Sequence, residues 1–121
     1  MSEFSQNRLE TRIKEIISTL IVTGQIKNHN LSTFTSVTEV RLAEDNANAT
    51  VYVSSLLSDN SLDKSVAALN SAAAFIQSRI AKNLRTKNTP HLIFKADRSY
   101  REAERINGII DGLMKDIDEE E

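Results

Sequence analysis

Residues 66–97 combine a regular helical pattern, a forced break and a short alternating pattern, and this combination most constrains the fold. Apolar residues first recur at spacings of three and four, as on one buried helix face: Val66, Leu69, Ala73, Ile76, Ile80 and Leu84. The only proline, Pro90, disfavours helical geometry at Thr89, so the helix is expected to stop around Lys87. Every second residue of 92–96 is apolar, which predicts a strand. The pattern therefore predicts one long helix leading into a strand.

The segments before this stretch predict a helix and a hairpin. Leu9, Ile13, Ile16, Ile17 and Leu20 share one helical face, and Gly24 is a plausible stop. Two strands are expected at Phe34–Leu42 and Ala47–Leu56, joined by an acidic turn. Together they predict an antiparallel hairpin with one buried face, although Val37 departs from the alternation of its strand.

The last segment predicts a further helix. Ser99 and Glu102 form a capping box, and an apolar stripe follows it, made of Ile106, Ile110, Leu113 and Ile117. Residues 118–121 are a short acidic tail with nothing to bury. The expected order is α-β-β-α-β-α in a single domain spanning residues 1–117, an α+β fold with a three-stranded sheet packed against helices.

Composition argues against several classes of protein. The 121 residues include no cysteine, and the two histidines, His29 and His91, have no acidic or hydroxyl partner at metal-ligand or triad spacing. The N-terminus has no apolar run typical of a signal peptide, and no stretch is long enough to span a membrane. We expect a soluble cytoplasmic protein that is not an enzyme, with no cofactor and no metal.

Charge is distributed unevenly although the net charge is only −2. Residues 77–105 carry eight bases against three acids, whereas residues 106–121 carry one base against six acids. A polarised domain of this kind presents a local cationic surface that its mean charge hides.

Three motifs in order resemble the ribosome-binding factor A family over about residues 4–116. They are FTSVTEVRLAEDNANATVYVS (34–54), ALNSAAAFIQSRIAKNLR (68–85) and TPHLIFKADRS (89–99). The resemblance implies a type II KH-like domain, and its element order agrees with the one expected above. It also implies a monomeric assembly factor that binds the immature small (30S) ribosomal subunit and its 16S ribosomal RNA.

Further expectations follow from the same resemblance. Members assist late maturation, including processing of the RNA 5′ end, and support growth in the cold. In some bacteria a ribosome-associated GTPase helps them to leave the subunit, so such a GTPase is a further expected partner. A different class of function stays open, namely a protein-interaction module that binds an acidic protein surface, on a ribosomal protein or a GTPase, without touching RNA.

The chain departs from the family pattern inside the long helix. The family carries an Ala-any-Gly kink, and the matching triplet is Ala72, Ala73 and Ala74. Alanine favours a helix interior by about 1 kcal/mol over glycine, so the bend is either lost or imposed by packing. Gln77 also stands where the family usually has a basic residue.

The candidate RNA-binding residues are basic. Arg79, Lys82, Arg85 and Lys87 gather at the end of the long helix, where the alternative is a solvated face favourable to the helix dipole. Arg98 and Arg101 lie near the start of the last helix, where the alternative to RNA binding is pairing with nearby acids. Arg8 and Arg12 lie off the apolar stripe of the first helix.

Aromatic stacking on RNA bases is not expected. Phe34, Phe75 and Phe94 occupy positions assigned to the core, leaving few aromatic side chains for the surface. Binding is therefore expected to depend on phosphate charge and shape, with little base readout.

Overall fold

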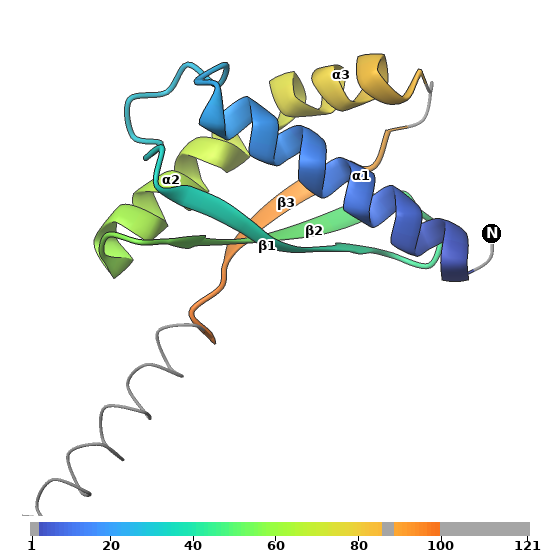
Figure 1. The fold of residues 1–121 in the computed structure, drawn as a ribbon, viewed down its shortest axis with the longest axis horizontal. Helices are drawn as coiled ribbons and strands as arrows, with labels where there is room; N and C mark the ends of the chain where they lie inside the picture. Colours follow the sequence, from blue (N-terminus) through green and yellow to red (C-terminus); the bar gives the residue numbers. More distant parts are fainter. Residues whose placement is uncertain (1–2, 86–88, 100–121) are drawn as a thin grey trace, which may run out of the picture.

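The structure, a computed structural model, describes residues 3–85 and 89–99. Its elements are α1 (Glu3–Val22), β1 (Thr35–Leu42), β2 (Asn48–Ser55), α2 (Asp59–Ser71), α3 (Ala73–Leu84) and β3 (His91–Ala96) (Figure 1). The predicted α+β fold with a three-stranded sheet is confirmed. The helix expected after Ser99 and the tail at 118–121 lie outside the described residues. None of the described helices has both the length and the apolar composition of a membrane span.

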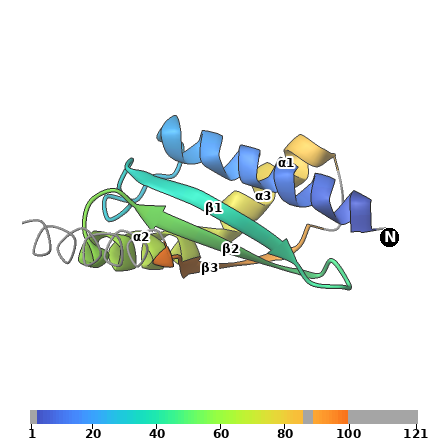
Figure 2. The same cartoon turned by 60° about the horizontal axis from the view of Figure 1, so that its bottom comes forward.

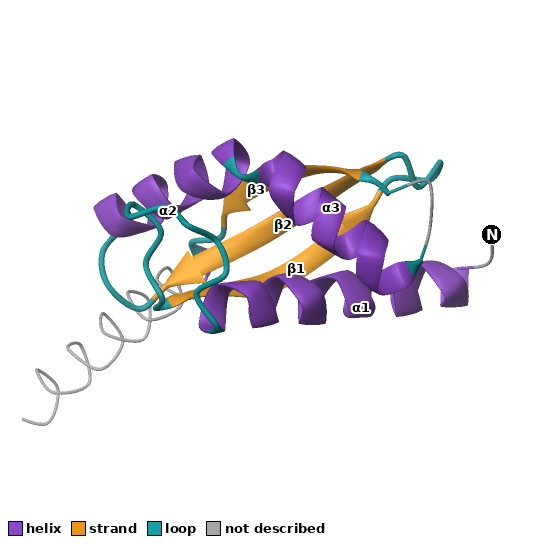
Figure 3. Cartoon of the chain, turned by 90° about the horizontal axis from the view of Figure 1, so that it is seen from above, coloured by secondary structure: helices purple, strands orange, loops and turns teal. Residues whose placement is uncertain are grey.

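The sheet has the order β1-β2-β3. β1 and β2 pair antiparallel as a hairpin, whereas β2 and β3 pair parallel, and the connection between parallel strands is made by α2 and α3. Seen from above, α1 runs along the β1 side, α2 runs along the β3 side, and α3 crosses from the β3 side toward α1 (Figure 3). In the tilted view, α1 and α2 flank the twisted sheet (Figure 2). This arrangement places the carboxyl end of α3 close to α1.

The core forms where the helix stripes meet one face of the sheet. Ala49, Val51 and Val53 of β2 are buried, and the intervening residues of that strand are partly exposed. The helices and the third strand contribute most of the other large buried side chains, among them Ile13, Ile16, Ile17, Leu20, Ile21, Leu62, Leu69, Ile76, Ile80, Leu92 and Phe94. The apolar periodicity therefore predicted the core-facing sides of α1, α3 and β3. Gly24 adopts φ +68° just after α1, as its role as a helix stop requires.

An irregularity in β1 explains the position of Val37. The pairing of β1 with β2 shifts register between Val37 and Glu39, so Thr38 is an extra residue in the strand. An extra residue reverses which alternate positions face the core. Val37 is therefore buried, and Phe34, expected in the core, is 55% exposed.

The long helix expected from the sequence is divided at Ala72, which corrects the prediction of one continuous helix. Ala72 has φ −94° and ψ 7°, outside the helical region but allowed for any L-residue. Its backbone N–H donates to the carbonyl oxygens of Ala68 and Leu69, each at 3.1 Å. The kink therefore needs no glycine, because no residue of the triplet has a positive φ.

Packing imposes the break on a sequence that favours a continuous helix. Asn70, just before the break, donates to the carbonyl oxygen of Phe94 (3.1 Å) and accepts from its backbone N–H (2.9 Å). Gln77, after the break, accepts from the backbone N–H of Leu92 at 3.0 Å. Both halves are thus tied to the outer edge of β3. These side chains also satisfy the strand's free edge, which would otherwise invite association.

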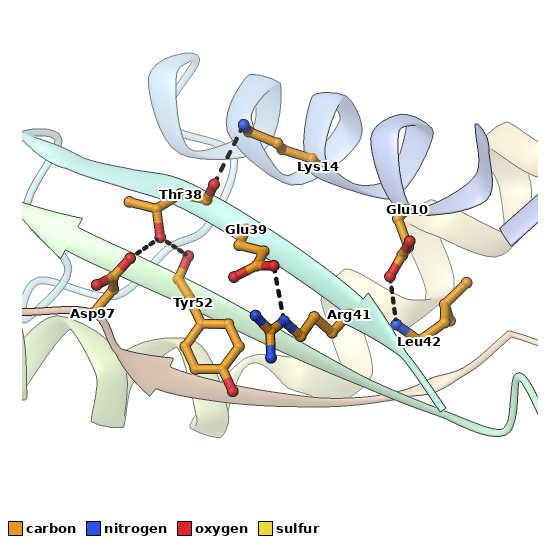
Figure 4. Close-up of polar contacts among 8 residues, drawn as sticks. All are labelled: Glu10, Lys14, Thr38, Glu39, Arg41, Leu42, Tyr52 and Asp97. Atoms are coloured by element: carbon orange, nitrogen blue, oxygen red, sulfur yellow. Dashed lines mark hydrogen bonds and ion pairs between the residues drawn. The ribbon is translucent and has the colours of Figure 1, made fainter. Parts of the chain in front are cut away.

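Side chains of α1 cover the opposite edge of the sheet in the same way. The Glu10 carboxylate accepts from the backbone N–H of Leu42 at 2.8 Å, and the Lys14 ammonium lies 3.5 Å from the carbonyl oxygen of Thr38 (Figure 4).

The open face of the sheet is polar, and there the Thr38 hydroxyl donates to Asp97 at 2.6 Å. Hydrogen bonds from Ser99 and then Thr38 lower the pKa of Asp97, which keeps this carboxylate charged.

Replacing Ala74 with glycine should lower the free energy of unfolding by up to about 1 kcal/mol without moving the kink. Ala74 is exposed in the first turn of α3, so the loss comes from helix propensity alone. Urea unfolding measures the stability, and backbone chemical shifts report the bend. Changes in chemical shift that extend to the residues of β3 would contradict a kink that is set by the Asn70 and Gln77 contacts.

Candidate nucleic-acid interface

A groove between α1 and α3 brings together cations from distant parts of the sequence. Its volume is about 530 Å³, and its lining includes Arg12 of α1 and Arg79 and Lys82 of α3. Arg79 and Lys82 are three residues apart on one helix, so they project from the same face. Arg12 joins them because α1 packs directly against α3. We call these lining residues the basic groove.

Polar neighbours hold Arg12 in place across the groove. Its guanidinium donates to Asn83 Oδ1 of α3 at 3.0 Å and lies 3.3 Å from the Glu15 carboxylate. Both partners of the ion pair are more than half exposed, so the pair is worth little in stability. With three cations and one carboxylate lining it, the basic groove keeps an excess of positive charge.

Arg79 is positioned by an aromatic ring rather than by an acid. Its guanidinium carbon lies 5.1 Å from the centroid of the Phe75 ring, one helical turn earlier on α3. A cation over an aromatic face is attracted to it, while the N–H groups at the guanidinium edge stay able to donate. Lys82 is exposed and has no acidic partner among the residues that the structure describes.

The remaining candidates on this side extend the positive surface or lie outside the described residues. Arg85 caps the end of α3 with φ 54° and is exposed, so the helix stops at Leu84, before the predicted end near Lys87. Arg8 lies one turn before Arg12 on α1 and lines a neighbouring hollow with it. Lys87 and Arg101 fall outside the described ranges.

Arg98 does not join the basic groove. It lies 2.5 Å from the Asp63 carboxylate and 3.9 Å from that of Asp59, both on α2. Its partners differ from the nearby acids considered from the sequence, because α2 packs against β3, which ends just before Arg98. Two carboxylates offset the charge of Arg98, so it contributes less to an anion-binding surface than the groove cations.

Phe75, assigned to the core from the sequence, is instead 37% exposed at the edge of the basic groove. The helical spacing could have predicted this exposure. Phe75 lies one position before Ile76, so it falls outside the apolar stripe that contains Ile76 and Ile80. Asn83 was also missed, since nothing in its local sequence marks it as a partner for Arg12.

The chemistry available in the basic groove is binding of anions. Guanidinium and ammonium groups bind phosphates, and the groove sets three of these cations beside a single glutamate. Residues 3–85 and 89–99 contain no group of His, Asp or Glu side chains able to hold a metal ion.

Comparisons with known proteins agree with this description. The model of the family described as ribosome-binding factor A matches residues 5–110. A protein of that name from Borreliella burgdorferi is 40% identical over 106 residues, 88% of each chain. The solution structure of a Thermotoga maritima protein named for the same factor superposes with a TM-score of 0.69 and 29% identity, covering 82% of this chain and 92% of that one.

A third relative is similar in fold. It is the Thermus thermophilus factor, a homology model fitted into the cryo-EM map of a 30S–factor complex, with a TM-score of 0.62, 24% identity, and coverage of 75% of this chain and 93% of that one. The family match spans most of the chain, and the relative from Borreliella is similar over nearly its whole length. The chain therefore belongs to the ribosome-binding factor A family.

Proposed function

We propose that this chain is a ribosome assembly factor that binds the immature small ribosomal subunit and docks on its RNA through the basic groove. The observation that carries the proposal is the meeting of Arg12, Arg79 and Lys82 from two helices in one groove. Membership of the family supports the choice of partner, because a relative was fitted into a map of a 30S complex.

Docking of this kind holds RNA in one arrangement without chemical change. The groove cations contact phosphates, and their fixed spacing on α1 and α3 favours a backbone of matching shape. Late maturation and processing of the RNA 5′ end would then proceed on an RNA whose competing arrangements are suppressed. This finer role rests on the family and is a proposal for this chain.

Co-sedimentation with small ribosomal subunits across a salt series tests the docking mode. Three phosphate contacts correspond to a slope of about −2 in log affinity against log salt, so affinity should fall roughly 16-fold between 50 and 200 mM. Contacts from Arg85 or from residues outside the described ranges would make the slope steeper. Binding that does not depend on salt would reject the electrostatic mechanism.

A second candidate is the protein-interaction module considered from the sequence. An exposed apolar cluster where β1 begins and β2 ends favours a protein partner, although through an apolar contact rather than the acidic surface expected from the sequence. The cluster is made of Phe34, Leu56 and Leu57, which are 55%, 74% and 54% exposed. Pull-down of ribosomal proteins after nuclease treatment separates the two candidates. Capture that survives removal of RNA supports the module, and capture lost with the RNA supports docking on RNA.

A further inference from the structure

We propose that Phe75 is the stacking platform for one unpaired nucleobase of the bound RNA, in a hollow beside the kink between α2 and α3. This inference deepens the proposed function and rests on it, because it adds base contact to a surface otherwise described as phosphate-binding. It also revises the expectation of little base readout, which assigned Phe75 to the core.

The hollow is lined by both apolar and polar groups. Its volume is about 320 Å³, and its lining joins the α2–α3 junction to the segment after α1: Gln25, Ile26, Lys27, Asn28, Ser71, Ala72 and Phe75. Ile26, Ala72 and Phe75 supply apolar surface, and the amide and hydroxyl groups around them can hydrogen-bond to the edges of a base. An aromatic ring that is 37% exposed can accept a base on its face.

The hollow lies next to the basic groove. Gln25 lines both, and the Phe75 ring on one side lies 5.1 Å from the Arg79 guanidinium on the other. A strand whose phosphates contact Arg79 and Lys82 therefore places an adjoining base next to Phe75. This charge complementarity favours RNA as the occupant over an apolar side chain of a protein.

The Phe75–Arg79 contact holds the two side chains next to each other, so that they can bind the base and the phosphate of one nucleotide. The ring restrains the guanidinium, which reduces the side-chain entropy lost when Arg79 binds a phosphate. The hollow then holds the base of a single-stranded segment, because bases in a helix are already paired and stacked. The predicted ligand is a loop, bulge or end of RNA rather than a duplex.

Affinity for a short single-stranded RNA, compared with an abasic strand of the same length, tests the platform. Stacking on an aromatic side chain is worth about 1–3 kcal/mol per base by alanine substitution. Phe75→Ala should therefore weaken binding of the normal strand by about tenfold. It should weaken binding of the abasic strand much less, because that strand loses only the restraint on Arg79. Phe75→Tyr should bind as the unmodified protein does, and Phe75→Leu should show a loss similar to that of alanine.

Phe34→Ala is the matched control, because Phe34 is also an exposed phenylalanine but does not line the hollow. The salt dependence of Phe75→Ala should equal that of the unmodified protein, whereas Lys82→Ala should reduce the slope by about 0.7. Equal losses on normal and abasic strands, or no loss on either, would overturn the platform. Recovery of full affinity by Phe75→Leu would also overturn it, since an apolar contact would then suffice.

The outcomes separate this inference from the proposed function. If the chain binds small subunits with steep salt dependence and Phe75→Ala has no effect on single strands, the platform is wrong and the function stands. If the chain fails to bind small subunits but still prefers a normal strand to an abasic one through Phe75, the function is wrong. If Phe75→Ala weakens only binding of ribosomal proteins after nuclease treatment, the occupant is a protein side chain and the platform is wrong.

Discussion

Replacing Phe94 with alanine is expected to lower the free energy of unfolding by about 3–5 kcal/mol. Phe94 is 2% exposed and is the largest of the fully buried side chains. It lies in β3 opposite Val51 of the central strand, where the helices meet the sheet. Removing its ring deletes apolar burial and leaves a cavity that close-packed neighbours cannot fill. For a domain of this size, such a loss is a large fraction of the total stability.

Urea unfolding of the full chain measures this loss, and Ile93→Ala is the matched control. Ile93 is the preceding residue of the same strand, but it faces away from the core and is 48% exposed. Its truncation should cost well under half as much, because about half of its surface is already in water and its removal leaves no buried cavity. Similar losses for the two variants would contradict the assignment of the core to one face of the sheet.

Reversing the charges of Arg79 and Lys82 together, as Arg79→Glu with Lys82→Glu, is expected to weaken binding to small ribosomal subunits by at least about 25-fold at 0.1 M salt. Each phosphate contact contributes a slope of about 0.7, which corresponds to roughly fivefold in affinity between 1 M and 0.1 M salt. Loss of both contacts therefore lowers the affinity by about five times five, or about 25-fold, and repulsion between the new carboxylates and the phosphates lowers it further. The double variant should also show a shallower salt dependence.

The matched control carries the same change of charge on other surfaces. Lys64 of α2 and Lys95 of β3 are exposed and do not line the basic groove. The pair Lys64→Glu with Lys95→Glu should therefore bind within a few-fold of the unmodified protein. Thermal melts should show both double variants folded, since these side chains are all exposed. Equal losses in the two double variants would indicate that net charge matters and that the groove does not.

Local pattern alone predicted most of the elements correctly. The spacing of Ile13 and Ile17, and that of Ile76 and Ile80, marks helix faces that are buried in the structure. Pro90 separates the end of α3 from β3 as expected. These features depend on residues close together in the chain, through side-chain period and allowed backbone angles, so a sequence reveals them directly.

Two features of the fold were decided by contacts between distant segments. The extra residue at Thr38 buries Val37 and exposes Phe34, because the register of β1 depends on its pairing with β2. The break at Ala72 contradicts the helix preference of three alanines. It is imposed by the hydrogen bonds of Asn70 and Gln77 to β3, which outweigh a local preference of about 1 kcal/mol or less.

The candidate site shows the same division. A spacing of three residues places Arg79 and Lys82 on one helix face, so this pair could be predicted from the sequence. The meeting of Arg12 with this pair, and that of Arg98 with Asp59 and Asp63, depends instead on tertiary contacts. The physical reason is that the packing of α1 on α3, and of α2 on β3, brings together residues that no local pattern relates.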